Sequence, residues 1–370
     1  MSAPSWFRLG GIERYVLGQQ ARSLAVALGV IGALIMLIDF VEISRGVGSD
    51  VDLSAPRILG LMLLKSPAVI LQLAPFVFLF GTLGAYVALN RRSELVAMRA
   101  AGVSAWRFVL PAAGAALLAG VVTIAALNPL ASYADGLFQR ERTRLSGSAA
   151  PEQAAAIWLR EGDDQRQMII RADSQDRANA RLLGVSFFIY IADGRGGRTF
   201  AERIDARSAA LSAGSWRLVD AVGARVGERG VRYATLDLRS SLADEEAFER
   251  FARPQSTPIW SLPAQIERIE NAGFSSTGYR LRLHQLMATP LVFAAMSILA
   301  AAFSLRLLRL GDLARMSAAA VILGFAFFFV NQASAAFGSA EVIAPFVAAW
   351  LPPVLTLLAA LTLLVYTEDG

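Results

Sequence analysis

Six long and nearly uncharged apolar stretches constrain this 370-residue chain more than any other feature of its sequence. A helix of about 20 apolar residues crosses the hydrocarbon layer of a bilayer, which is roughly 30 Å thick. A charge at the centre of that layer costs about 3 kcal/mol or more. We therefore predict six membrane-spanning helices, at residues 23–43, 56–90, 108–127, 286–305, 316–340 and 342–367.

The charged residues are concentrated between Ala131 and Arg282, which indicates a soluble domain between the third and fourth spans. Over the whole chain they amount to 18%, below the usual quarter of a soluble domain. The net charge of +5 does not indicate a nucleic-acid partner, because arginines and acids alternate without forming a basic stripe. The chain has no cysteine, so we expect neither a disulfide nor a thiolate metal site.

The middle domain has the pattern of an all-β structure. Short apolar or alternating runs are separated by turn residues such as Asp193–Gly197, at residues 157–160, 167–171, 185–191, 198–204, 216–222 and 231–238. Strands at this spacing favour a sandwich or jelly roll. An amphipathic helix follows at Leu262–Ala272, with Ser261 as its N-cap and Gly273 as its stop.

The expected fold is an α-helical membrane protein with six transmembrane helices plus an inserted all-β, jelly-roll-like domain. Its expected parts are an N-terminal membrane half at residues 1–130, the β domain at 131–258, and a connecting helix with the C-terminal membrane half at 259–370.

Arginines in the short connections predict the orientation, because positive residues are enriched in cytoplasmic loops. The short outside loops would carry only Arg45 and Arg57. The inside segments would carry Arg8, Arg14, Arg22, Arg91, Arg92, Arg99, Arg107, Arg306, Arg309 and Arg315. We therefore expect both termini in the cytoplasm and the middle domain outside it.

Signatures of an enzyme are missing from the sequence. The only lysine, Lys65, follows Leu64 and not a glycine-rich loop, so the chain has no Walker A motif and ATP hydrolysis is expected in a separate protein. There is no Gly-x-Ser-x-Gly elbow. The only histidine, His284, is expected to be structural, and no metal or other cofactor is expected.

The segment between the second and third spans, RRSELVAMRAAGVSAW, is the most informative one. Ser93 can cap a helix that begins at Glu94, and Gly102 can end it. A glutamate in the first turn also complements the helix dipole. This predicts a short cytoplasmic helix at about residues 91–102, held between two spans.

Leu95 and Met98 share one apolar side of this predicted helix. Two interpretations are open: the helix receives force from a separate ATPase, or it is an interfacial helix without a partner. In the third span, Ala112, Ala116 and Gly120 form a stripe of small residues, for which we expect packing within the chain.

This segment resembles the coupling helix of the LptF/LptG family, the permeases of lipopolysaccharide export. The resemblance covers nearly the whole chain. IERYVLGQQ is similar to the family's N-terminal interfacial helix. Three further segments resemble parts of the family's periplasmic β-jellyroll domain and follow one another in the same order: IWLREGDDQRQMIIRAD, LLGVSFFIYIADGRG and IDARSAALSAGSWRLVDA.

The resemblance implies a subunit of an ABC transporter in the bacterial inner membrane. The chain would pair with a second, LptF-like permease on two copies of an LptB-like ATPase. It would extract lipopolysaccharide and pass it through the β-jellyroll domain to an LptC-like periplasmic partner. Glu94 lies where the family has its coupling glutamate. The residues expected to couple the chain to the ATPase are Glu94, Arg91, Arg92, Leu95, Met98 and Arg99.

The outer end of the first span departs from the family, whose members often have lysines there. This chain has Asp39, Glu42 and Arg45 instead. Arg45 is a candidate for holding a lipid phosphate. Asp39 is also a headgroup candidate, although an acid would repel phosphate, and its other interpretation is a side chain that only lies in the headgroup zone.

Two further functions are compatible with parts of the sequence. One is a permease that pulls on a periplasmic partner without moving a lipid, which would also need a coupling helix. The other is a membrane-bound enzyme acting on envelope lipids, with carboxylates such as Asp163 and Asp164. These two acids fall in a predicted turn, where acids are expected for solvation alone.

Overall fold

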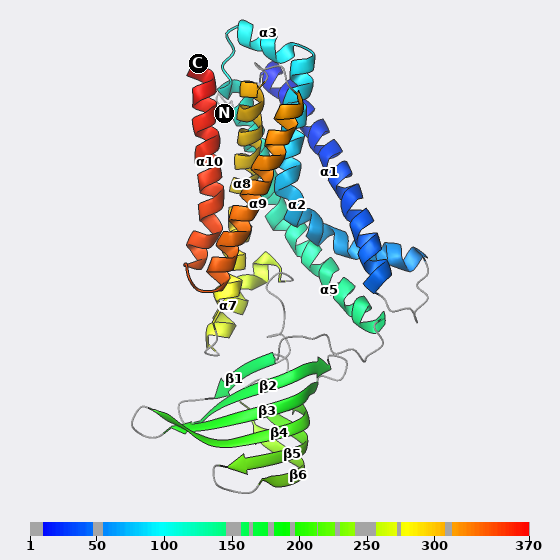
Figure 1. The fold of residues 1–370 in the computed structure, drawn as a ribbon, viewed down its shortest axis with the longest axis vertical. Coiled ribbons are helices and arrows are strands. Elements are labelled where there is room, and N and C mark those ends of the chain that lie inside the picture. The colour runs from blue at the N-terminus through cyan, green and yellow to red at the C-terminus, as the bar shows by residue number, and fades with distance from the viewer. Residues whose placement is uncertain are drawn as a thin grey trace, which may run out of the picture. The chain divides into compact units, whose positions relative to one another are not determined.

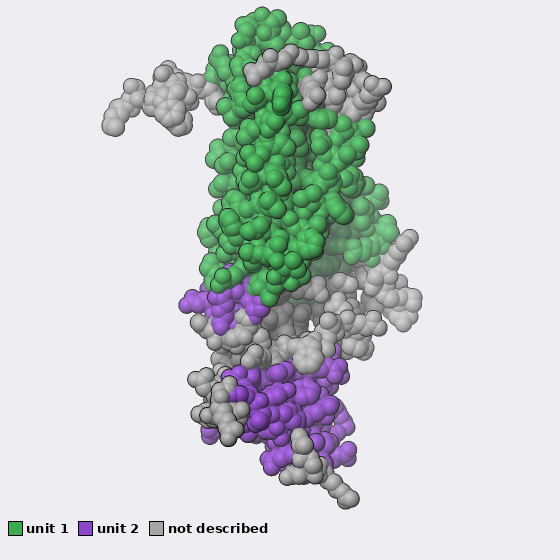
Figure 2. Space-filling model, turned by 60° about the vertical axis from the view of Figure 1, so that its left-hand side comes forward, with its two compact units in different colours: residues 1–145, 254–263, 277–370 green, residues 146–253, 264–276 purple. Residues whose placement is uncertain are grey.

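The structure is a computed structural model, and the residues it describes form two compact units, each considered by itself (Figure 2). The membrane unit comprises residues 1–145, 254–263 and 277–370, and the β unit comprises residues 146–253 and 264–276. The residues described are 10–46, 55–145, 157–162, 166–176, 181–192, 197–212, 214–225, 230–240, 257–271, 275–307 and 313–369.

Among the described residues, six helical stretches are long and apolar enough to cross a membrane, which confirms the predicted spans. The third stretch combines α4, the π-helical turn η2 and α5. The helices are α1 (Gly11–Gly46), α2 (Ala55–Arg91), α4 (Trp106–Val122), η2 (Thr123–Leu127), α5 (Asn128–Leu145), α8 (Thr277–Leu307), α9 (Leu313–Ser339) and α10 (Pro345–Asp369).

Two helices extend further than we expected. The segment IERYVLGQQ, which resembles the family's N-terminal interfacial helix, forms the first turns of α1, and no proline separates it from the apolar run. Residues 131–145, which we expected to belong to the β domain, continue α5, because the turn η2 carries the helix past Leu127.

Helix α8 is the centre of the membrane unit. It packs against α2, α4, α9 and α10, and its apolar segment is the most buried of the six. A Cβ atom on Gly120 of α4 would lie only 2.4 Å from the Cα atom of Pro290 in α8. Because Ala112 and Ala116 are buried on the same stripe, these small residues let α4 and α8 pack closely within one chain.

One end of the membrane unit brings together segments that are far apart in the sequence (Figure 1). The start of α1, the short helix α3 (Glu94–Ala100) and the last turn of α10 meet there. We call this the α3 end. The opposite end includes the start of α2 and the last turns of α5, where Arg57 and Glu141 are 3.8 Å apart.

The β unit contains a six-stranded antiparallel sheet with the strand order β1-β2-β3-β4-β5-β6. Every predicted run is a strand, so the all-β character of the inserted domain is confirmed. All described pairings join strands that follow one another in the chain, which makes the described sheet a meander. The strands are β1 (Ile157–Gly162), β2 (Arg166–Asp176), β3 (Arg181–Ala192), β4 (Arg198–Ser212), β5 (Ser215–Arg225) and β6 (Val231–Arg239).

The alternation along the strands separates an apolar core from a charged surface. Phe187 and Trp216 are fully buried and meet edge to face, with their ring centroids 6.0 Å apart. Outside this core, arginines pair with acids of the same strand or of a neighbouring strand, as in the 2.6 Å contact of Arg207 with Asp220. These pairs explain why the domain is rich in charge but has no basic stripe.

The chain re-enters the membrane unit through the 3₁₀ turn η4 (Ile259–Ser261), which is followed by α7 (Leu262–Asn271). The amide of Ile259 donates to the Oδ1 atom of Asn128 at 2.9 Å. The predicted helix is confirmed, but the predicted cap is wrong, since the hydroxyl of Ser261 donates backwards to the carbonyl of Pro258. The predicted stop, Gly273, lies outside the described residues.

Candidate functional site

Helix α3 follows α2 after a connection of only two residues. It begins at Glu94, as predicted, but Ser93 does not cap it. Ser93 has a left-handed backbone conformation with φ of 57°, whereas an N-cap side chain needs an extended backbone. The sharp turn that redirects the chain out of α2 uses this conformation, and the amide of Ser93 donates to the carbonyl of Asn90 at 2.7 Å.

The other end of α3 is closed by a Schellman motif. Gly102 has φ of +78°, a conformation that glycine adopts without strain. Its amide donates to the carbonyl of Arg99, and the amide of Val103 donates to the carbonyl of Met98, both at 3.0 Å. The predicted glycine stop is therefore confirmed, and these bonds fix the direction in which the chain enters α4.

The inner face of α3 is anchored in the membrane unit. Leu95 is only 3% exposed and belongs to the unit's hydrophobic core, and Met98 packs against that core. We expected both residues on the face that meets an ATPase. Their apolar side chains are instead used to hold α3 in place, and the outward face of the helix consists of Val96, Ala97 and Ala100.

Glu94 is tied to the first helix. The hydroxyl of Tyr15 donates to its Oε2 atom at 2.8 Å, and a guanidinium nitrogen of Arg92 lies 4.0 Å from its Oε1 atom. The side chain of Glu94 nevertheless remains 30% exposed. Arg91 and Arg92 are exposed beside it, so three of the predicted coupling residues lie together at the α3 end.

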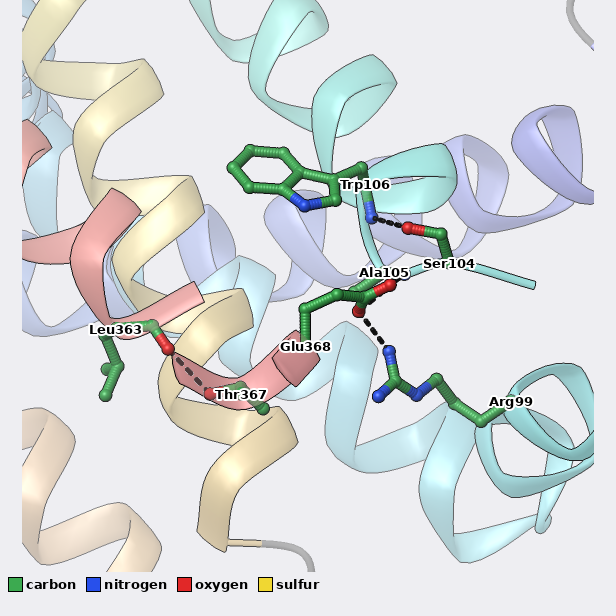
Figure 3. A network of polar contacts seen from close by, with 7 residues as sticks. All are labelled: Arg99, Ser104, Ala105, Trp106, Leu363, Thr367 and Glu368. Carbon is green, nitrogen blue, oxygen red and sulfur yellow. Dashed lines mark hydrogen bonds and ion pairs between the residues drawn. The ribbon is translucent and has the colours of Figure 1, made fainter. Parts of the chain in front are cut away.

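Arg99 points toward the C-terminal helix. Its guanidinium pairs with the carboxylate of Glu368 in the last turns of α10 (Figure 3). The backbone amide of Ala105 donates to the two oxygens of the same carboxylate, at 3.1 and 3.3 Å. A second ion pair, between Arg107 and Glu13 at 3.0 Å, joins the start of α4 to α1.

The C-terminal end of the first span contains a cluster that the sequence prediction missed. Lys65 of α2 lies 2.8 Å from carboxylate oxygens of both Asp39 and Glu42 in α1. Asp39 is buried and serves as a counter-ion for the lysine, while its assignment as a lipid-headgroup residue stays a prediction. The signal was available, because a lysine inside an apolar span needs an acidic partner.

Other candidates contribute less to a site. Arg45 lies in the last turn of α1, and its side chain is outside the described residues, as are Asp163 and Asp164. His284 meets the ring of Phe346 edge to face, with their centroids 5.5 Å apart.

The model of the family described as lipopolysaccharide export system permease LptF/LptG matches residues 14–366. This range includes both sets of membrane helices, α3 and the whole described sheet. No curated protein matches the chain.

Proposed function

Because the chain belongs to the lipopolysaccharide export permease family LptF/LptG, we propose that it is one of two permease subunits of an ABC transporter that extracts lipopolysaccharide from the bacterial inner membrane. The observation that carries this proposal is α3. A short helix is anchored between two spans, its outward residues Val96, Ala97 and Ala100 are exposed, and the glutamate at its start is partly exposed.

One copy of an LptB-like ATPase binds α3 in this proposal, and a second copy binds the partner permease. The outward residues Val96, Ala97 and Ala100 are apolar and would let another protein approach, and the charged Arg91, Arg92 and Glu94 lie beside them at the start of α3. A small apolar centre with a polar rim is typical of a protein interface. The anchoring of α3 through Leu95 would pass the movement of the ATPase on to the spans.

The exposed faces of the membrane unit support a lipid substrate. Helices α1 and α9 have the least buried apolar segments of the six, and residues such as Leu34, Leu37, Phe325 and Phe329 are more than half exposed. Each acyl methylene left in water costs about 0.8 kcal/mol. These faces and a second, LptF-like permease would enclose the acyl chains, and the β unit would pass the lipid to an LptC-like periplasmic partner.

Short sequences favour the LptG position over LptF in the complex. ERYVLGQQ at the start, DFVE in the first span, VNQASAAFG in α9 and the TEDG tail resemble LptG. The α3 end would face the cytoplasm and the β unit the periplasm. The arginines support this orientation, because Arg91, Arg92, Arg99 and Arg107 lie at or beside α3, and positive residues are enriched on the inside.

Purification of the tagged chain from its native membranes in a mild detergent tests the proposal. We expect an ATPase, a second permease of the same family and lipopolysaccharide to co-purify. The variant Glu94→Arg should lose the ATPase and keep the second permease. Tyr15→Phe is the matched control, because it removes the hydrogen bond to Glu94 and leaves the carboxylate in place. A wild-type chain that purifies alone would contradict the proposal.

A further inference from the structure

The last turns of α10 reach the connection between α3 and α4. The carboxylate of Glu368 accepts hydrogen bonds from the side chain of Arg99 and from the backbone amide of Ala105 (Figure 3). These partners are 269 and 263 residues away in the sequence. One carboxylate from the second membrane half therefore holds both sides of the loop that ends α3.

The start of α4 needs such an acceptor. The first amides of a helix have no carbonyl partner within the helix, and a negative charge near them is favourable. Helix α4 has no acidic residue in its first turn and no side-chain cap at Ala105. The local acceptor is the Oγ atom of Ser104, to which the amide of Trp106 donates at 3.4 Å. Glu368 supplies from another helix the negative charge that the first turn of α4 lacks, and an acceptor for the amide of Ala105.

The contact also determines where Arg99 points. Its side chain is 29% exposed, whereas that of Arg92, which precedes α3, is 65% exposed. We expected Arg99 to be one of the residues that couple the chain to an ATPase. Its charge is instead used inside the protein, against α10.

We propose that Glu368 is a positioning residue that clamps α10 to the coupling segment, so that displacement of α3 moves both membrane halves together. This inference rests on the proposed function. The chain itself connects α3 only to α2 and α4, in the first half. The clamp adds α10, which packs along the central helix α8. Movement of α3 then reaches the second half directly.

The neighbouring residue supplies a matched control. Thr367 donates its hydroxyl to the carbonyl of Leu363 in its own helix, at 2.7 Å (Figure 3). The side chain of Thr367 is buried, and those of Arg99 and Glu368 are partly buried. The hydrogen bond of the Thr367 hydroxyl, however, stays within α10. Thr367→Val therefore changes the same turn of α10 without removing the clamp.

Charge exchange in the assembled transporter tests the clamp. ATP hydrolysis and ATP-driven lipid release are measured for Glu368→Arg, Arg99→Glu, the double variant and Thr367→Val. We expect each single exchange to lower the lipid released per ATP roughly five- to tenfold, the lower range of coupling between sites. The double variant should recover part of the loss, and Thr367→Val should resemble the wild type. The clamp would be overturned if the lipid released per ATP were unchanged in the single variants, or if the double variant recovered none of the loss.

Cross-linking supplies a second measurement if the exchanged variants do not assemble. The chain has no native cysteine, so Arg99→Cys with Glu368→Cys gives a defined pair for a short bifunctional maleimide. If α3 and α10 move as one body, the cross-linked transporter keeps its lipid release per ATP, and a loss on cross-linking would overturn the clamp. Failure of the wild-type chain to bind any ATPase would refute the proposed function instead, which separates the two claims.

Discussion

At the scale of single residues, the cluster around Lys65 shows how a charge is accommodated in an apolar span. Its amine lies 2.8 Å from carboxylate oxygens of Asp39 and Glu42. The two acids are in α1 and the lysine is in α2, so the cluster joins the first two spans. Among the described residues, the Oδ2 atom of Asp39 has no hydrogen-bond partner. The lysine therefore provides most of the compensation for a buried negative charge.

Removal of the lysine should destabilise the protein strongly. In Lys65→Met the carboxylate of Asp39 loses its counter-ion while it stays buried, and breaking such a pair costs about 3–5 kcal/mol. Glu42→Gln should cost less than about 1 kcal/mol, because the side chain of Glu42 is 62% exposed. Thermal unfolding of the purified chain in detergent measures both. Equal losses in the two variants would contradict this account of the cluster.

At the scale of the elements, most of the fold follows from local sequence patterns. The spans and strands were predictable because hydrophobic runs and alternation are local properties. The cap at Ser93 was not, because the left-handed turn out of α2 overrides the preference of serine for an N-cap. The pair of Arg99 with Glu368 was not predictable either. In the sequence, each of the two looks like an ordinary charged residue at the end of a helix, and nothing local indicates that they meet.

The close contact of α4 with α8 should be sensitive to a single methyl group. Gly120→Ala would bring a Cβ atom to 2.4 Å from the Cα atom of Pro290, so the two helices must separate. Overpacking of this kind costs about 1–3 kcal/mol. Gly114→Ala is the control in the same helix, because its Cβ would meet nothing within 4 Å, and it should be neutral or slightly stabilising. Thermal unfolding of both variants measures the difference, and similar values would contradict the proposed packing.

At the scale of the whole molecule, the two membrane halves are joined by an inserted β unit, and helix α3 lies in the first half. The sequence placed α3 correctly between the second and third spans. It did not reveal that Leu95 and Met98 face inward, because an apolar side of a short helix indicates burial without saying against which neighbour. Only the structure therefore identifies which residues of α3 face outward.

The orientation can be measured with single cysteines, because the native chain has none. Arg232→Cys is at an exposed position of the β unit, and Arg14→Cys is at an exposed position near the start of α1, which is not among the α3 residues proposed to bind the ATPase. In spheroplasts, a membrane-impermeant maleimide should label the first variant at once. It should label the second only after the membrane is permeabilised. The reverse pattern would contradict a periplasmic β unit.

ATP-driven lipid transfer tests the central claim most directly. The complete transporter is reconstituted into liposomes that contain lipopolysaccharide, and its transfer to a soluble periplasmic acceptor is followed with and without ATP. We predict transfer by the wild type only with ATP, and at least about tenfold less by Glu94→Arg, while Tyr15→Phe stays close to the wild type. Transfer that does not require ATP, or that is unaffected by Glu94→Arg, would contradict a permease driven through α3.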